Sequence, residues 1–159
     1  MEAKAKLLGH PIHQMVIVLP LGLLIGAWIA DVALFVTGKP ALAAVAYWNT
    51  IGGIAGGLFA AIFGFIDWIA VPIGTRAKRV GMWHAGFNVL MLLLFTGSLL
   101  IRHFQPTHMP TLAAFGCATG GLAISIVSGW LGGELVNRLG VGVSSNVGLD
   151  APSSLSERR

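Results

Sequence analysis

Four long apolar runs dominate this chain, and they restrict its fold more than any other feature. They cover residues 15–37, 48–73, 82–102 and 111–136, and an Ala-rich helical segment, ALAAVAYW, is expected before the second run. A helix needs about 20 apolar residues to cross the hydrocarbon core of a membrane, and each run is long enough. Only 10% of the 159 residues are charged, whereas about a quarter is usual in a soluble domain. The sequence therefore predicts an all-α integral membrane protein, a four-helix transmembrane bundle embedded in the lipid bilayer.

The segments between the runs have the chemistry of loops. TGKP, VPIGTRAKR and HFQPTHMP are rich in turn-forming or charged residues. The first run follows two lysines, as in a signal peptide, but it is too long for the apolar part of one, so we expect it to be a helix of the mature protein. A polar tail without aromatic residues begins at Ser144, and we expect it to be disordered. The chain thus reads as a four-helix domain over residues 1–143 and a tail over 144–159.

The basic residues indicate an orientation. With four crossings, both termini and the loop at residues 74–81 share one side of the membrane, and only Lys39 and Arg102 fall on the other. An excess of Lys and Arg marks the cytoplasmic side, which predicts a multi-pass protein of the bacterial inner membrane with both termini in the cytoplasm. We expect no nucleic-acid partner, because these residues flank apolar runs and form no phosphate-binding stripe. The residues on the basic side are Lys4, Lys6, Arg76, Lys78, Arg79, Arg138, Arg158 and Arg159.

A weak internal similarity relates the two halves of the chain. Placing His10 over His84 aligns HPIHQMVIVLPL with HAGFNVLMLLLF, and placing Gly56 over Gly120 aligns GGLFAAIFGFIDW with GGLAISIVSGWLG. The two alignments, with shifts of 74 and 64 positions (10 to 84 and 56 to 120), predict two helix hairpins related by an axis along the membrane normal. A chance match in so apolar a chain is the alternative.

Small residues recur at helical spacing in the second and fourth runs. Membrane helices associate by close packing, since lipid is as apolar as leucine, and small residues permit close approach. Close packing explains most of this stripe, and room for a flat cofactor between helices is the functional alternative. Cys117 is the only cysteine, so no disulfide can form within the chain. The stripe comprises Gly53, Gly57, Ala60, Ala61 and Gly64 in the second run, and Gly116, Gly120, Gly121, Ser125, Ser128 and Gly132 in the fourth.

Each run contributes an ionisable side chain near the end that we place in the cytoplasm. Ionisable groups inside a bilayer are costly and are functional candidates by default. Taken singly, the histidines at the start of the first run are interfacial residues, and Glu134 pairs with Arg138 one helical turn later. Taken together, the groups predict a site in one layer, with Asn88 placed one turn after His84 to orient its ring. The layer comprises His10, His13, His84, Asp67 and Glu134.

The opposite end of the bundle carries a second set of polar residues. Asp31 lies five helical turns after His13 and Arg102 closes the third run at the same level, so we predict a structural salt bridge between them. His103, His108 and Met109 lie in a short loop there. Their side chains are types that bind metal, but we expect an ordinary exposed loop.

Four segments, GHPIHQMVIVLPLG, FGFIDW, GTRAKRVGMWHAGFN and SGWLGGELVNRLGVGV, resemble a bacterial membrane family catalogued as domain of unknown function 2231. The resemblance extends from residue 9 to about residue 143 and implies four transmembrane helices without an established activity. Relatives fused to Rieske-type or c-type cytochrome modules imply redox work. Many relatives have proline after the second histidine, where this chain has Gln14, and this difference affects the helix start and leaves the histidines in place.

The residue types exclude several chemistries. The sequence has no G-x-S-x-G turn for hydrolysis, no phosphate loop with its lysine and no C-x-x-C pair. Three classes remain open. The one we favour is a haem b protein with His84 and either His13 or His10 as axial ligands and Asn88 beside them. It would be an electron carrier, not a stand-alone enzyme, working with a quinone or a partner cytochrome.

The second class is a non-haem Zn, Fe or Mn site. Its ligands would be drawn from His10, His13, His84, Asp67 and Glu134. The third class is a scaffold, or a transporter of protons or small solutes, whose polar layer relays protons or binds a quinone. Homo-oligomers are compatible with all three classes.

Overall fold

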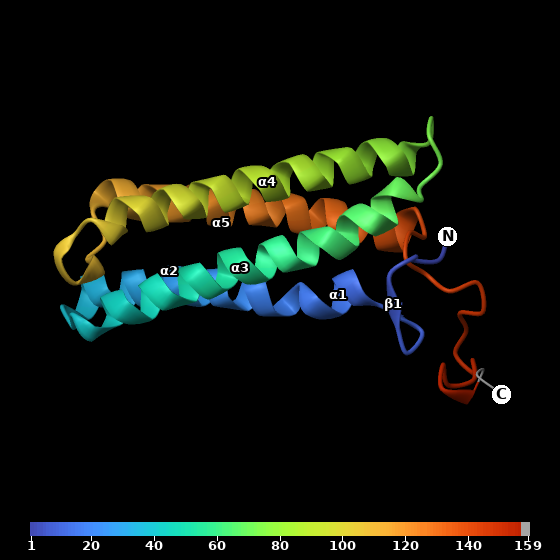
Figure 1. Cartoon of the computed structure of the whole chain (residues 1–159). Helices are drawn as coiled ribbons and strands as arrows, with labels where there is room; N and C mark the ends of the chain where they lie inside the picture. Colours follow the sequence, from blue (N-terminus) through green and yellow to red (C-terminus); the bar gives the residue numbers. More distant parts are fainter. Residues whose placement is uncertain (157–159) are drawn as a thin grey trace.

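Four long helices account for most of the computed structural model, which describes residues 1–156 (Figure 1). The first crossing joins a short helix α1 (Ile12–Val16) to α2 (Val18–Thr37), and α3 (Ala41–Ile69), α4 (Arg76–His103) and α5 (Leu112–Gly133) make the other three. All four crossings are long and apolar enough to span a membrane. The predicted four-helix transmembrane architecture is confirmed. Arg158 and Arg159, which contribute to the predicted orientation, lie outside the described residues.

Two helices begin before their apolar runs. Helix α3 starts at Ala41, so the Ala-rich segment expected before the second run is helical and continues into the span. Helix α4 starts at Arg76, where the Thr75 side chain accepts a hydrogen bond from the Lys78 amide. Such a cap satisfies one of the free amides at a helix start. The basic residues of this loop therefore lie on the first turn of a helix and not in an extended connection.

The first crossing is interrupted near Ile17. Pro20 lacks an amide hydrogen, so it cannot donate to the carbonyl of Val16, the residue four positions earlier. Helix α1 ends at Val16 and α2 begins at Val18, with a Leu21 to Ile17 hydrogen bond of 3.3 Å across the break. The result is a separate short turn of helix that carries His13 at the mouth of the bundle.

The four crossings pack as two hairpins (Figure 1). Helix α2 packs along α3 and α4 packs along α5, and the two hairpins meet in a core formed by Leu24, Met91, Phe95 and Ala118. Glycines allow each hairpin to close, because a Cβ at Gly53 would lie 2.5 Å from the Leu24 side chain and one at Gly121 would lie 2.8 Å from the Phe95 ring. Large apolar side chains such as Val18, Leu93 and Leu112 are exposed on the outside, as lipid-facing residues are.

Both ends of the described chain lie at the same end of the bundle, which we call the terminus end (Figure 1). The Met1 ammonium donates to the Gly140 carbonyl at 2.6 Å, and Ala3 is buried. Beyond it, β1 (Lys6–Leu7) and β2 (His10–Pro11) form a two-stranded antiparallel pair. Two short helices complete the fold: a 3-10 helix η1 (Pro106–His108) at the opposite end, and a π-helix η2 (Glu134–Arg138) that extends α5 at the terminus end.

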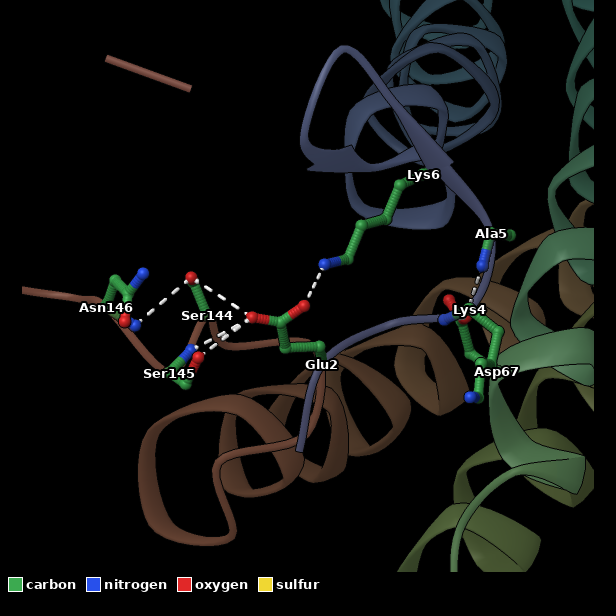
Figure 2. Close-up of polar contacts among 8 residues, drawn as sticks. All are labelled: Glu2, Lys4, Ala5, Lys6, Asp67, Ser144, Ser145 and Asn146. Atoms are coloured by element: carbon green, nitrogen blue, oxygen red, sulfur yellow. Dashed lines mark hydrogen bonds and ion pairs between the residues drawn. The ribbon is translucent and has the colours of Figure 1, made fainter. Parts of the chain in front are cut away.

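The tail contacts the N-terminal segment (Figure 2). The Glu2 carboxylate binds the Lys6 ammonium and accepts hydrogen bonds from Ser144 and from the amide and hydroxyl of Ser145. The Lys6 contact, followed by the Ser145 hydrogen bonds, lowers the pKa of Glu2 to about 2. Residues 144–156 contain turns and no long helix, so the separate polar tail stays a prediction, but its first residues have defined partners.

Candidate functional site

His13 is held by the small-residue stripe of α3. Its Nδ1 lies 2.9 Å from the carbonyl oxygen of Ala60. A carbonyl oxygen only accepts hydrogen bonds, so Nδ1 carries a hydrogen, and in this tautomer the lone pair of the imidazole lies on Nε2. Gly64 lies one turn beyond Ala60, and a Cβ there would be 3.0 Å from two atoms of the imidazole. The glycine therefore makes the space in which the ring lies.

His84 is held in the same way by α5. Its Nδ1 lies 2.9 Å from the Ser128 carbonyl oxygen, and a Cβ at Gly132 would be 3.2 Å from its Cε1. The Ser128 hydroxyl lies 3.2 Å from the same Nδ1. Asn88 adds a contact that His13 lacks, because its amide nitrogen donates to the His84 Nε2 at 3.1 Å and to the His84 carbonyl at 2.9 Å. Asn88 thus lies where the sequence places it, next to the His84 ring.

The matching surroundings give the register of the internal repeat. On the first helix of each hairpin, a shift of 71 positions relates 13 to 84, 24 to 95 and 31 to 102. On the second helix, a shift of 68 positions relates 53 to 121, 60 to 128 and 64 to 132. The register predicted from the sequence, with His10 over His84, is wrong by one turn. His13 is the equivalent of His84, since each ring contacts the corresponding carbonyl and glycine of its own hairpin.

The two rings face the space between the hairpins. Their centroids lie 6.4 Å apart and their planes are nearly perpendicular, at 88°. A cavity of about 850 Å³ surrounds them and is lined by all four crossings. Most of the lining is apolar, and Gln14, Asp67, Asn88 and Ser125 add polar groups. Six of the small lining residues are equivalent pairs of the repeat: Gly57 and Ser125, Ala60 and Ser128, Gly64 and Gly132.

Three of the five residues in the predicted polar layer have other partners. Asp67 borders the cavity, but its Oδ1 accepts the amides of Lys4 at 2.6 Å and Ala5 at 2.9 Å, which ties down the N-terminal segment (Figure 2). Glu134 pairs with Arg76 at 2.6 Å, so the predicted pair with Arg138 is wrong. The π-helical turn places Glu134 toward the start of α4, where Arg76 begins the helix.

His10 is exposed on β2, outside the cavity lining, and its Nε2 lies 3.4 Å from the Ser154 hydroxyl. Within residues 1–156, no three side chains among His, Cys, Asp and Glu gather closely enough to hold a metal ion together. The set of five metal ligands predicted from the sequence, His10, His13, His84, Asp67 and Glu134, is therefore not brought together. The geometry retains His13 and His84 as the facing pair.

The polar residues at the opposite end include a buried ion pair. Arg102 donates to both carboxylate oxygens of Asp31, at 3.1 and 2.5 Å, and each side chain is only 1% exposed. The predicted salt bridge is confirmed. Close by, the rings of His103 at the end of α4 and His108 in η1 lie parallel within 14°, and the Tyr47 hydroxyl lies 2.8 Å from the His103 Nδ1. Tyr47 also stacks on the His108 ring at a centroid distance of 3.8 Å, and within residues 1–156 neither histidine belongs to a cluster of three metal-binding side chains.

The sequence did not reveal how the histidines are oriented. Ala60 and Ser128 act through backbone carbonyls, which any residue offers, so residue identity carries no direct signal. An indirect signal exists, because a small residue is followed four positions later by glycine in both second helices, at 60 and 64 and at 128 and 132. Two such pairs facing two histidines distinguish the correct register of the repeat from the one predicted.

The fold and the site define a class of membrane protein. It is a membrane-spanning helix bundle with a largely apolar cavity and a facing pair of histidines. The chain belongs to the family described as Predicted membrane protein (DUF2231), whose model matches residues 9–145. This match confirms the resemblance seen in the sequence. A search of curated proteins and a search of solved structures each gave no match.

Proposed function

We propose that the cavity binds haem b between the two hairpins, with His13 and His84 as axial ligands, and that the protein carries electrons within the membrane. The facing histidine pair is the observation that carries this proposal. Two imidazoles bound to opposite faces of one iron, through bonds of about 2 Å, have ring centroids roughly 6 Å apart. The observed separation is 6.4 Å. Perpendicular rings are compatible with this arrangement, because each plane contains only its own metal–nitrogen bond.

The hydrogen bonds on Nδ1 suit metal ligation. Metal-binding histidines usually donate their second ring nitrogen to a carbonyl or a carboxylate, which fixes the tautomer and the direction of the ring. His13 and His84 both do so, each to a main-chain carbonyl of the partner helix. Exposed histidines at a membrane surface have no reason to share this arrangement.

The size and lining of the cavity also suit a flat, largely apolar group. A volume of about 850 Å³ is at the upper end of the range for small-molecule sites, roughly 300 to 1,000 Å³. Small residues on α3 and α5 leave the space open on both sides of the histidines. No Lys or Arg lines the cavity within the described residues, so the acidic propionates of a haem b would have to reach the basic residues at the terminus end.

The haem would supply reversible one-electron transfer, and the chain would bind it, orient it and keep it from water. The electron donor or acceptor would be a membrane quinol or a partner cytochrome, since both can reach a haem that lies within the membrane. A non-haem metal site is less well supported, because only His13 and His84 converge and a stable Zn or Fe site needs three or four protein ligands. We further propose that the terminus end faces the cytoplasm of a bacterial cell, on the basis of its excess of Lys and Arg.

Absorption spectra of the detergent-purified protein, produced with added haem, test the proposal. Two imidazole ligands keep the iron low-spin, so the expected spectrum has a sharp Soret band that moves on reduction by dithionite and resolved α and β bands. The His13→Ala and His84→Ala variants should each change the spin state or lose the haem. His10→Ala is the matched control, because His10 lies at the same end but outside the cavity, and it should leave the spectrum unchanged. A colourless wild-type protein, or identical spectra for all three variants, would refute the proposal.

A further inference from the structure

The two proposed ligands have different surroundings, although the hairpins that carry them are equivalent. Asn88 donates to the Nε2 of His84 at 3.1 Å. The shift of 71 positions that relates His13 to His84 makes Ile17 the equivalent of Asn88. Isoleucine has no hydrogen-bonding group, so no side chain at that position competes for the Nε2 of His13. Ser128, whose hydroxyl also approaches His84, is likewise replaced by Ala60 beside His13.

We infer that His84 is the exchangeable ligand of the pair and that Asn88 makes it so, which opens the His84 side of the haem to a small neutral ligand such as a diatomic gas. This inference rests on the proposed function. The lone pair of Nε2 can either bind a metal or accept the Asn88 hydrogen bond, and it cannot do both. Ligation by His84 therefore costs this hydrogen bond, whereas ligation by His13 costs none.

The second contact of Asn88 strengthens the competition. Its amide nitrogen also donates to the His84 carbonyl at 2.9 Å, within the same turn of α4. This bond keeps the amide beside the imidazole, so Asn88 is in place to recapture Nε2 whenever the ring leaves the metal. When a diatomic ligand occupies the metal, His84 returns to the arrangement seen in this structure, with Nδ1 on the Ser128 carbonyl and Nε2 on Asn88. Asn88 is thus a positioning residue that stabilises the unligated form of His84.

Equilibrium titration of the reduced protein with carbon monoxide tests the inference. Asn88→Leu removes the competing hydrogen bond in a side chain of similar size, so His84 should bind the haem more firmly and the apparent affinity for carbon monoxide should fall roughly two- to tenfold, the factor that one hydrogen bond of ordinary net strength gives. Ile17→Asn is the matched variant, because it places the same amide beside His13. It should raise the apparent affinity for carbon monoxide, since both ligands would then be exchangeable.

The single-ligand variants distinguish the two histidines. His84→Ala should keep its haem, held by His13 in a five-coordinate form that binds carbon monoxide most tightly. His13→Ala should retain less haem per protein, because its remaining ligand still competes with Asn88. Equal carbon monoxide affinities of the wild type and Asn88→Leu, or better haem retention by His13→Ala than by His84→Ala, would overturn the inference while the haem spectrum still supports the proposed function. A wild type without any haem spectrum would refute both.

Discussion

The buried ion pair at the opposite end of the bundle allows a quantitative test of the packing. Asp31→Ala removes the two hydrogen bonds that Asp31 accepts from Arg102, at 3.1 and 2.5 Å. The guanidinium would then keep only the Ser98 hydroxyl at 3.4 Å, since its Nε has no partner within residues 1–156. Removing one member of a buried pair costs about 3–5 kcal/mol, mostly because a charge remains buried without a partner. We expect the lower end of this range, because separated membrane helices find other polar partners.

Exchanging the two charged residues with each other tests whether the contact between them causes the loss of stability. Asp31 and Arg102 are equivalent positions of the repeat and contact each other between the two hairpins. Asp31→Arg combined with Arg102→Asp should therefore recover most of the stability that Asp31→Ala loses. The free energy of unfolding is measured by titrating the protein in micelles of a mild detergent with a denaturing detergent and following its helix content. Ser98→Ala is the control and should cost less than about 1 kcal/mol. An Asp31→Ala variant as stable as the wild type, or a double exchange no better than Asp31→Ala, would refute the reasoning.

Three further predictions concern topology, packing and pH. Reporters active only in the cytoplasm should work when fused to either terminus, and an inactive C-terminal fusion would contradict the proposed orientation. Gly64→Ala and Gly132→Ala should each cost about 1–3 kcal/mol of unfolding free energy by crowding a histidine ring. Gly86→Ala is the control and should cost nothing, because a Cβ at Gly86 would have no atom within 4 Å. Equal stability of all three variants would mean that the histidine rings do not fill the space beside Gly64 and Gly132. The low pKa of Glu2, about 2 against an ordinary 4.5, means that its contacts are fully present above pH 4.5 and weaken as the pH falls toward 2. The protection factor of the Ser145 amide, which is its hydrogen-exchange rate compared with the intrinsic rate at the same pH, should fall over this range in the wild type but not in Glu2→Gln.

Hydrophobic run length, the depth of charged residues along the runs and helical spacing predicted much of this structure. The four crossings were predictable because each apolar run is long and its flanks carry turn residues. The Asp31–Arg102 pair was predictable because two opposite charges fell at one depth, and a buried charge needs a partner. Asn88 was predictable because residues four apart share a helix face. These predictions rest on distances along a single helix or along the membrane normal, which the sequence contains directly.

The wrong predictions concern contacts between different elements of the fold. Glu134 has a possible partner four residues later on its own helix, yet the π-helical turn directs it to Arg76 of α4. Asp67 shares a face with the small-residue stripe, but its carboxylate binds the amides of Lys4 and Ala5. Backbone amides near a chain terminus need acceptors as much as side chains do, and a sequence does not show where a terminal segment folds back. The cavity itself depends on how the hairpins are spaced, which no pattern within one run determines.

The repeat explains why the polar side chains inside this membrane bundle lie in pairs. Two residues of the first hairpin meet their own equivalents in the second, as His13 meets His84 and Asp31 meets Arg102. Identical side chains at one level can face a symmetric cofactor from both sides. At the opposite end of the bundle the two equivalent residues, Asp31 and Arg102, carry opposite charges. Two copies of the first hairpin packed in the same way would bury two carboxylates together, and two copies of the second would bury two guanidinium groups, both of which are unfavourable. The Asp31–Arg102 pair therefore favours packing of the first hairpin against the second over packing of two identical hairpins. Only the second hairpin carries Asn88, so this packing leaves an asparagine beside one of the two histidines and not beside the other.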